Sequence, residues 1–134
     1  MFVRWYGQTT VLCKRAKDAG YGLPNFVVNG TCTYPDLILG ENNLIFDNTY
    51  IGHDFNIGNH VYVSPGVKLA GHCEIADLSF LGMGSNVKGG LRLGAETLLG
   101  AGSLLLSNTE EHGLYLGSPA RLVRDHVESG IHIK

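Results

Sequence analysis

Aliphatic side chains recur at every sixth position through the central part of this chain. The run continues without a miss for twelve positions: Leu39, Ile45, Ile51, Ile57, Val63, Leu69, Ile75, Leu81, Val87, Leu93, Leu99 and Leu105. The residue after each aliphatic is mostly Gly, Ser or Ala, and the residue two before it is mostly small or β-branched. A fixed six-residue repeat therefore organises the chain.

Each six-residue unit is typical of a short strand followed by a corner. Side chains two apart on a strand share a face, so the aliphatic residue and the small residue two before it both point inward. The glycine or other small residue after the aliphatic suits a tight corner. Three strands complete a coil of about 18 residues, and stacked coils bury one aliphatic column. The sequence predicts an all-β fold, a single-stranded left-handed parallel β-helix of hexapeptide repeats.

The two ends of the chain depart from this repeat. Residues 9–19 place apolar side chains at helical spacing before Gly20, which predicts a short N-terminal helix. Residues 114–117 are predicted to form a final strand, and Pro119 in the favoured first turn predicts a helix over 120–127. Such caps cover the open edges of a β-helix. We expect three parts: an N-terminal cap segment at 1–26, the β-helix at 27–117, and a C-terminal cap helix and tail at 118–134.

Composition and charge argue against several classes of function. Ten Lys and Arg against twelve Asp and Glu give a net charge of -2 without a basic stripe, so no nucleic-acid partner is expected. The three cysteines, Cys13, Cys32 and Cys73, form no CxxC pair, which favours a reducing cytoplasm. No stretch approaches the ~20 apolar residues that a membrane span requires. We expect a cytoplasmic protein with no membrane partner.

The sequence resembles bacterial sugar acyltransferases of the left-handed β-helix superfamily in two stretches, IGHDFNIGNHVYVSPGVKLAGHCEIADLSFLGMGSNVKGG and LYLGSPARLV. It is most similar to the branch of sialic acid O-acetyltransferases and UDP-amino-sugar N-acetyltransferases. The specific features are the pair His53-Asp54, the VSPGV that follows it, and the closing GSPAR. Full-length members of this branch carry an N-terminal nucleotide-sugar-binding domain, and here only about 26 residues precede the predicted β-helix.

Acyl transfer to an amine or hydroxyl needs a base that accepts the acceptor's proton. Histidine, with a reference pKa near ~6.5, suits that role, and His53 lies two residues after a buried aliphatic and therefore on a corner. Asp54 would hold the imidazole in one tautomer. The residues alone leave two alternatives open, a solvated corner histidine and an aspartate that only forms a turn.

Gly71 follows His53 by one predicted coil and should lie beside it. In similar enzymes the backbone N–H of the matching glycine points at the thioester, so the resemblance implies that Gly71 stabilises the oxyanion. A plain corner glycine is the alternative. The same spacing puts His72 beside Asp54, as an ion pair or as a catalytic partner.

The resemblance also implies that acetyl-CoA, the acyl donor, binds in a groove between the protomers of a homotrimer. The matching positions are Tyr62, Met83 and Ala101, and Lys88 and Arg121 are candidates for neutralising the phosphates. Trimer contacts and ordinary solvated cations are the alternatives for these residues.

A metal site is not expected, although γ-class carbonic anhydrases hold zinc with three histidines on this fold. The spacing of His53, His60 and His72 does not match that arrangement. Together with the His53 corner, the resemblance implies an enzyme, an acetyltransferase acting on an amino or hydroxyl group of a small sugar-type acceptor. Two other readings stay open: a non-catalytic β-helix scaffold, and a subunit that needs a separate substrate-binding partner. The sequence identifies neither the acceptor nor the length of the acyl chain.

Overall fold

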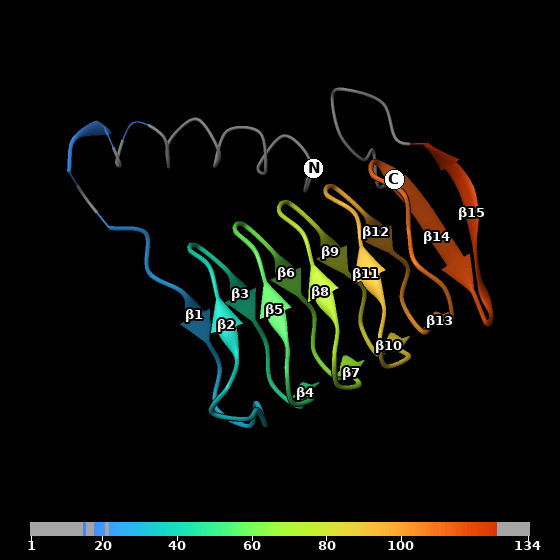
Figure 1. Cartoon of the computed structure of the whole chain (residues 1–134), viewed down its shortest axis with the longest axis horizontal. Helices are drawn as coiled ribbons and strands as arrows, with labels where there is room; N and C mark the ends of the chain where they lie inside the picture. Colours follow the sequence, from blue (N-terminus) through green and yellow to red (C-terminus); the bar gives the residue numbers. More distant parts are fainter. Residues whose placement is uncertain (1–14, 16–17, 21, 126–134) are drawn as a thin grey trace.

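The computed structural model describes residues 15, 18–20 and 22–125. In this part the chain winds into stacked coils along one axis, with β1 at one end and β15 at the other (Figure 1). The strands are β1 Phe26–Val27, β2 Ile38–Leu39, β3 Leu44–Ile45, β4 Tyr50–Ile51, β5 Asn56–Ile57, β6 Tyr62–Val63, β7 Lys68–Leu69, β8 Glu74–Ile75, β9 Phe80–Leu81, β10 Asn86–Val87, β11 Arg92–Leu93, β12 Leu98–Leu99, β13 Leu104–Leu105, β14 Gly113–Gly117 and β15 Ala120–Asp125.

Each strand of the repeat pairs in parallel with the strand one coil further along. Leu44 is in register with Tyr62, and Tyr62 with Phe80, an offset of 18 residues at each step. Three sheets result, in the orders β1-β3-β6-β9-β12-β14-β15, β4-β7-β10-β13 and β2-β5-β8-β11. The predicted left-handed parallel β-helix of hexapeptide repeats is therefore confirmed.

The core is the predicted column of aliphatic side chains. Every sixth residue from Ile45 to Leu105 is at most 3% exposed. Small polar residues share the inside, including Thr49 and Ser79. Phe55 is the largest side chain at the inward positions two before an aliphatic, where Leu37 and Leu91 are also large; it is fully buried and lies directly behind the corner that carries His53. Truncating one leucine or isoleucine of the aliphatic column to Ala typically lowers the free energy of unfolding by about 2–5 kcal/mol.

The C-terminal end differs from the prediction. Residues 120–125 form strand β15, not a helix, and β15 runs antiparallel to β14. Gly117 pairs with Ala120, so Ser118 and Pro119 form the two-residue loop of a hairpin. β14 would otherwise be the outermost strand of its sheet, and pairing with β15 satisfies its backbone groups better than an adjacent helix would. The predicted final strand at 114–117 is confirmed as part of β14.

The predicted helix at 9–19 lies largely outside the described residues. Arg15 and Asp18 are helical, and Ala19 N–H donates a hydrogen bond of 3.1 Å to the carbonyl oxygen of Arg15. In the described residues no helix has the length and apolar character that a membrane crossing requires.

Candidate active site

Three kinds of corner connect the three sheets. The His53 corner leads from the β4 sheet to the β5 sheet through residues 34–37, 52–55, 70–73 and 88–91. The Asn59 corner leads from the β5 sheet to the β6 sheet through residues 40–43, 58–61, 76–79 and 94–97. The Met83 corner leads from the β6 sheet to the β7 sheet through residues 64–67, 82–85 and 100–103.

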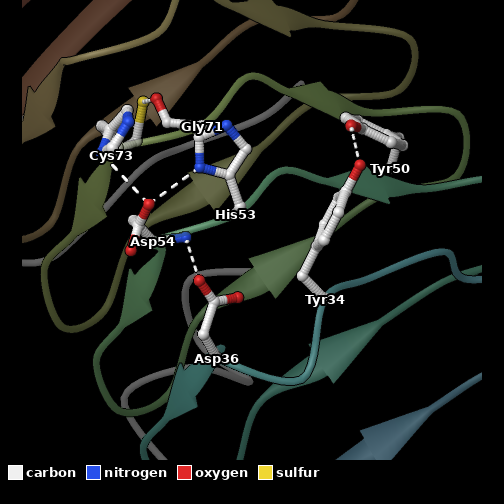
Figure 2. Close-up of polar contacts among 8 residues, drawn as sticks. Tyr34, Asp36, Tyr50, His53, Asp54, Gly71 and Cys73 are labelled. Atoms are coloured by element: carbon white, nitrogen blue, oxygen red, sulfur yellow. Dashed lines mark hydrogen bonds and ion pairs between the residues drawn. The ribbon is translucent and has the colours of Figure 1, made fainter.

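His53 and Asp54 form a hydrogen-bonded pair at the His53 corner (Figure 2). Nδ1 of His53 lies 2.8 Å from Oδ2 of Asp54, and both side chains are about half exposed, at 51% and 58%. A carboxylate can only accept, so the imidazole Nδ1–H donates and the lone pair of the neutral ring is at Nε2. The pair therefore presents a base whose tautomer is fixed.

Asp54 is held by its backbone as well as by His53. Its φ of 52° is left-handed, a conformation that Asp and Asn tolerate better than most residues. Its N–H donates to Oδ2 of Asp36 at 2.7 Å, and Nδ1 of His72 lies 3.5 Å from the Asp54 carboxylate. The hydrogen bond from His53 lowers the pKa of Asp54, with a smaller contribution from the charge of His72, so the carboxylate stays ionised.

Gly71 lies directly beside the imidazole of His53. A Cβ at Gly71 would lie 3.0 Å from Nε2 of His53, so the basic nitrogen faces this glycine. A Cβ at Gly52 would approach the backbone nitrogen of Gly71 to 2.5 Å, which real side chains do not reach. The predicted neighbourhood of His53, Gly71 and His72 is thus what the structure shows.

Backbone N–H groups at equivalent positions of the corners have different partners. At the Asn59 corner, Glu41 N–H donates to Asn59 Oδ1, and Asn59 N–H donates to Asp77 Oδ1, both at 2.8 Å. At the His53 corner the next residues in the column are Gly71 and Gly89, which have no side chain. Within the described residues the N–H groups of His53 and Gly71 consequently have no hydrogen-bond acceptor. Because these positions are glycines, no side chain of the following coil caps the N–H groups of His53 and Gly71.

His53, Asp54 and His72 also form a group with one metal-ligating atom each, and these atoms lie within 4.8 Å of one another. The Asp54 oxygen in this group already accepts the hydrogen bond from His53. His60 lies on the Asn59 corner, where its Nδ1 is 2.9 Å from Nδ2 of Asn42, so the three histidines do not converge. A site that works without a metal stays our prediction.

The predicted coenzyme-binding residues lie in several different places on the prism. Lys88 is exposed and shares the His53 corner. Met83 and Ala101 stack on successive coils of the Met83 corner, and Tyr62 points outward from β6, where its ring stacks on Phe80 at 5.0 Å. Arg121 is exposed on β15. The single chain thus brings together His53, Asp54 and Gly71, and it leaves Tyr62, Met83, Ala101 and Arg121 elsewhere.

Two tyrosines beside His53 were not found by the sequence reasoning. Tyr34 contacts His53 edge-on, with ring centroids 5.8 Å apart, and its hydroxyl is 3.3 Å from that of Tyr50 (Figure 2). Tyr34 is one coil before Gly52, so the same 18-residue spacing that located Gly71 would have placed it here. The repeat is weak before Ile38, and this obscured the relation.

Comparison with known proteins identifies acyltransferases as relatives. The chain is 38% identical over 82 residues to an acyl-(acyl-carrier-protein)–UDP-N-acetylglucosamine O-acyltransferase from Burkholderia lata. The aligned residues are 61% of this chain and 31% of the relative. The chain therefore spans less than a third of that relative's length. No family model matches the chain.

Solved structures share the fold over most of the chain. PerB from Caulobacter crescentus, in complex with CoA and GDP-perosamine, is 26% identical with a TM-score of 0.71, covering 84% of this chain and 63% of PerB. The acetyltransferase domain of PglB from Neisseria gonorrhoeae, in complex with acetyl coenzyme A, is 19% identical with a TM-score of 0.75, covering 88% and 66%. The second likeness supports the fold alone. The chain is a left-handed β-helix of hexapeptide repeats that is related to acyltransferases of this fold.

Proposed function

We propose that this protein transfers an acyl group, acetyl from acetyl-CoA, to an amino or hydroxyl group of a sugar or nucleotide sugar. One observation carries the proposal: Nε2 of His53, fixed by the 2.8 Å bond from Nδ1 to Asp54, faces the backbone of Gly71. A base and an N–H donor at one point are what acyl transfer needs. The related Burkholderia enzyme is named for an acyl transfer to UDP-N-acetylglucosamine, and PerB was solved with CoA and a nucleotide sugar.

The reaction follows from this geometry in two steps. The acceptor nitrogen or oxygen attacks the thioester carbonyl carbon while its proton moves to Nε2 of His53, and Asp54 stabilises the resulting imidazolium. The negative charge that develops on the carbonyl oxygen is stabilised by Gly71 N–H. The carbon–sulfur bond then breaks, and the leaving thiolate takes the proton back from His53.

The proposed acyl donor is a thioester, and the similar proteins differ in the molecule that carries the acyl group. The Burkholderia relative is named for an acyl-carrier-protein donor, whereas PerB and the PglB domain were solved with CoA or acetyl coenzyme A. Met83 and Ala101 have backbone N–H groups without an acceptor in the described residues, which suits a pantetheine arm held by backbone groups. Lys88 and Arg121 are exposed cations that would neutralise the CoA phosphates. We therefore favour CoA as the carrier.

A homotrimer would bring the separated residues together. His53 and Gly71 lie on one corner, whereas Met83 and Ala101 lie on another and Tyr62 points outward from β6. A groove between two protomers would combine the His53 corner of one with the Met83 corner of its neighbour. Such a site is incomplete in one chain.

The decisive test is the acetylation rate of His53→Ala with acetyl-CoA and a panel of nucleotide amino sugars. We expect a loss of about 100-fold or more, because a general base contributes that much. His60→Ala is the matched control, a histidine at the Asn59 corner, and should keep the parent rate. A loss of no more than about threefold in His53→Ala would remove the general-base assignment. A folded oligomer that binds no acetyl-CoA by calorimetry would favour the scaffold interpretation.

Mixing two inactive variants tests the shared site. Ala101→Trp should block coenzyme binding at the Met83 corner, and His53→Ala removes the base. Co-refolded mixtures of the two should regain activity, since some grooves then pair an intact His53 with an intact Ala101 of a neighbour. Mixtures as inactive as the separate variants, in a species of about three times 14.5 kDa, would contradict a site between protomers.

A further inference from the structure

The surface beside His53 includes two tyrosines that the proposed reaction has not used. Tyr50 lies on β4, and Tyr34 lies one coil earlier at the same corner. Their rings are perpendicular with centroids 6.3 Å apart, and their hydroxyl oxygens are 3.3 Å apart. Tyr34 is 40% exposed and also contacts His53. Tyr34 therefore links the ring of Tyr50 to the imidazole of His53 through two edge-on contacts.

Backbone hydrogen bonds hold both tyrosines in place. Cys32 forms an isolated parallel bridge with Tyr50, in which Ile51 N–H donates to the Cys32 carbonyl at 2.9 Å. Leu37 N–H donates to the Tyr34 carbonyl at 3.2 Å and closes a turn there. The hydrogen bond with Tyr34 raises the pKa of Tyr50, so the phenol stays protonated. The surface is neutral and is built on the first coils of the prism.

The position of the pair decides which reactant could contact it. In Figure 2, His53 lies between Asp54 on one side and the two tyrosines on the other. Gly71, the proposed site of the thioester carbonyl, lies one coil further toward the C-terminus, whereas Tyr34 lies one coil toward the N-terminus. A donor that extends toward the later coils leaves the tyrosine side of His53 to the acceptor.

We propose that Tyr34 and Tyr50 form the binding surface for the pyranose ring of the acceptor, an inference that rests on the proposed function. An aromatic ring offers an apolar face to the C–H groups of a sugar, and a phenol both donates to and accepts from its hydroxyls. Lys68 is the register partner of Tyr50, but its Nζ already donates to Asn48. The chemistry of the pair is therefore suited to the sugar, not to a phosphate.

The test separates sugar from nucleotide with three probes. Ring signals of Tyr34 and Tyr50 are followed by NMR during titration with N-acetylglucosamine, UDP and UDP-N-acetylglucosamine, and acetyl-CoA binding is measured by calorimetry on the same samples. We expect both sugar-containing probes to shift the tyrosine signals and UDP alone to leave them unchanged. Tyr34→Ala should weaken the binding of UDP-N-acetylglucosamine about tenfold, and Tyr50→Phe about 3- to 10-fold through the lost hydroxyl. Acetyl-CoA affinity should stay within twofold of the parent value.

Tyr34→Phe provides a variant that keeps the ring if Tyr34→Ala fails to fold, and it should weaken sugar binding as Tyr50→Phe does. Shifts caused by UDP alone, or variants that bind the sugar as tightly as the parent protein, would overturn the inference. Loss of acetyl-CoA binding in the parent protein is a different result, because it contradicts the proposed function and not the tyrosine surface alone.

Discussion

The His53 corner and the Asn59 corner occupy equivalent positions in the six-residue repeat. They differ in whether side chains of the next coil accept hydrogen bonds from their backbone N–H groups. At the Asn59 corner, side chains of successive coils cap the N–H groups of the coil before, as Asp77 does for Asn59 at 2.8 Å. At the His53 corner, Gly71 and Gly89 occupy the capping positions, and the N–H groups of His53 and Gly71 have no acceptor in the described part of the chain. The chain itself therefore caps the N–H groups of Glu41 and Asn59, whereas those of His53 and Gly71 stay uncapped within the described residues.

This difference shows how a regular repeat can carry a local site. The backbone N–H of Gly71 has the same position in its six-residue repeat as that of Asn59. The absence of a side chain at Gly89 is therefore enough to turn a structural donor into a potential catalytic one. Asp54 has two roles in the same corner: its left-handed φ of 52° forms the turn, and its carboxylate orients His53. A site of this kind needs no inserted loop.

Capping the free donor should have the largest effect. In Gly89→Asn the new amide oxygen should accept from Gly71 N–H, as Asn59 Oδ1 accepts from Glu41 N–H. We expect the acetylation rate to fall about 100-fold, the range for one lost oxyanion donor. Gly89→Ala is the matched control, since it adds the Cβ, 3.1 Å from the Gly71 carbonyl, without an acceptor. An equal loss of acetylation rate in Gly89→Asn and Gly89→Ala would mean that steric crowding by the added Cβ, and not capping of Gly71 N–H, is responsible.

Removing the orienting charge should have the next largest effect. Asn tolerates the left-handed backbone of Asp54, so Asp54→Asn should keep the corner but lose the carboxylate that stabilises the imidazolium. We expect the turnover rate at saturating acetyl-CoA to fall about 10- to 100-fold. The affinity for acetyl-CoA, measured by calorimetry, should not change. A variant with the parent turnover rate would show that Asp54 only forms the turn.

The capped corner should respond in stability and not in activity. Asp77→Ala removes the acceptor of the Asn59 N–H and of its side-chain amide at 3.4 Å. We expect the free energy of unfolding to decrease by about 1 kcal/mol, measured by urea denaturation, with the acetylation rate unchanged. A loss of activity without a loss of stability would contradict the division of roles between the two corners.

The pH dependence of stability should show the smallest effect. The pKa of Asp54 is lowered from 3.8, so its pairing stabilises the fold above that value and is lost as the pH falls through the lower folded value. The melting temperature of the parent protein should exceed that of Asp54→Asn from pH 6 to 4, and the difference should shrink only below about pH 3.8. A difference that vanishes between pH 6 and 5 would be inconsistent with this pairing.

Prediction from sequence succeeded where the repeat is regular. The 18-residue coil placed Gly71 beside His53 and His72 beside Asp54, because parallel pairing fixes the register of every coil on the one before. It failed at the C-terminal end, where Pro119 suggested the first turn of a helix and the chain instead forms the hairpin of β14 and β15. Local propensity for a helix was outweighed there by the need of β14 for a strand partner.

The sequence by itself determined the β-helix, its aliphatic column and the corner on which His53 lies, since a period of six leaves one inward arrangement for those side chains. Only the tertiary structure decided that Nε2 of His53 faces Gly71, that the N–H of Gly71 lacks an acceptor, and that Tyr34 contacts the imidazole. These features depend on side-chain torsions and on contacts between coils. A periodicity fixes which residues are neighbours, but not how their polar atoms point.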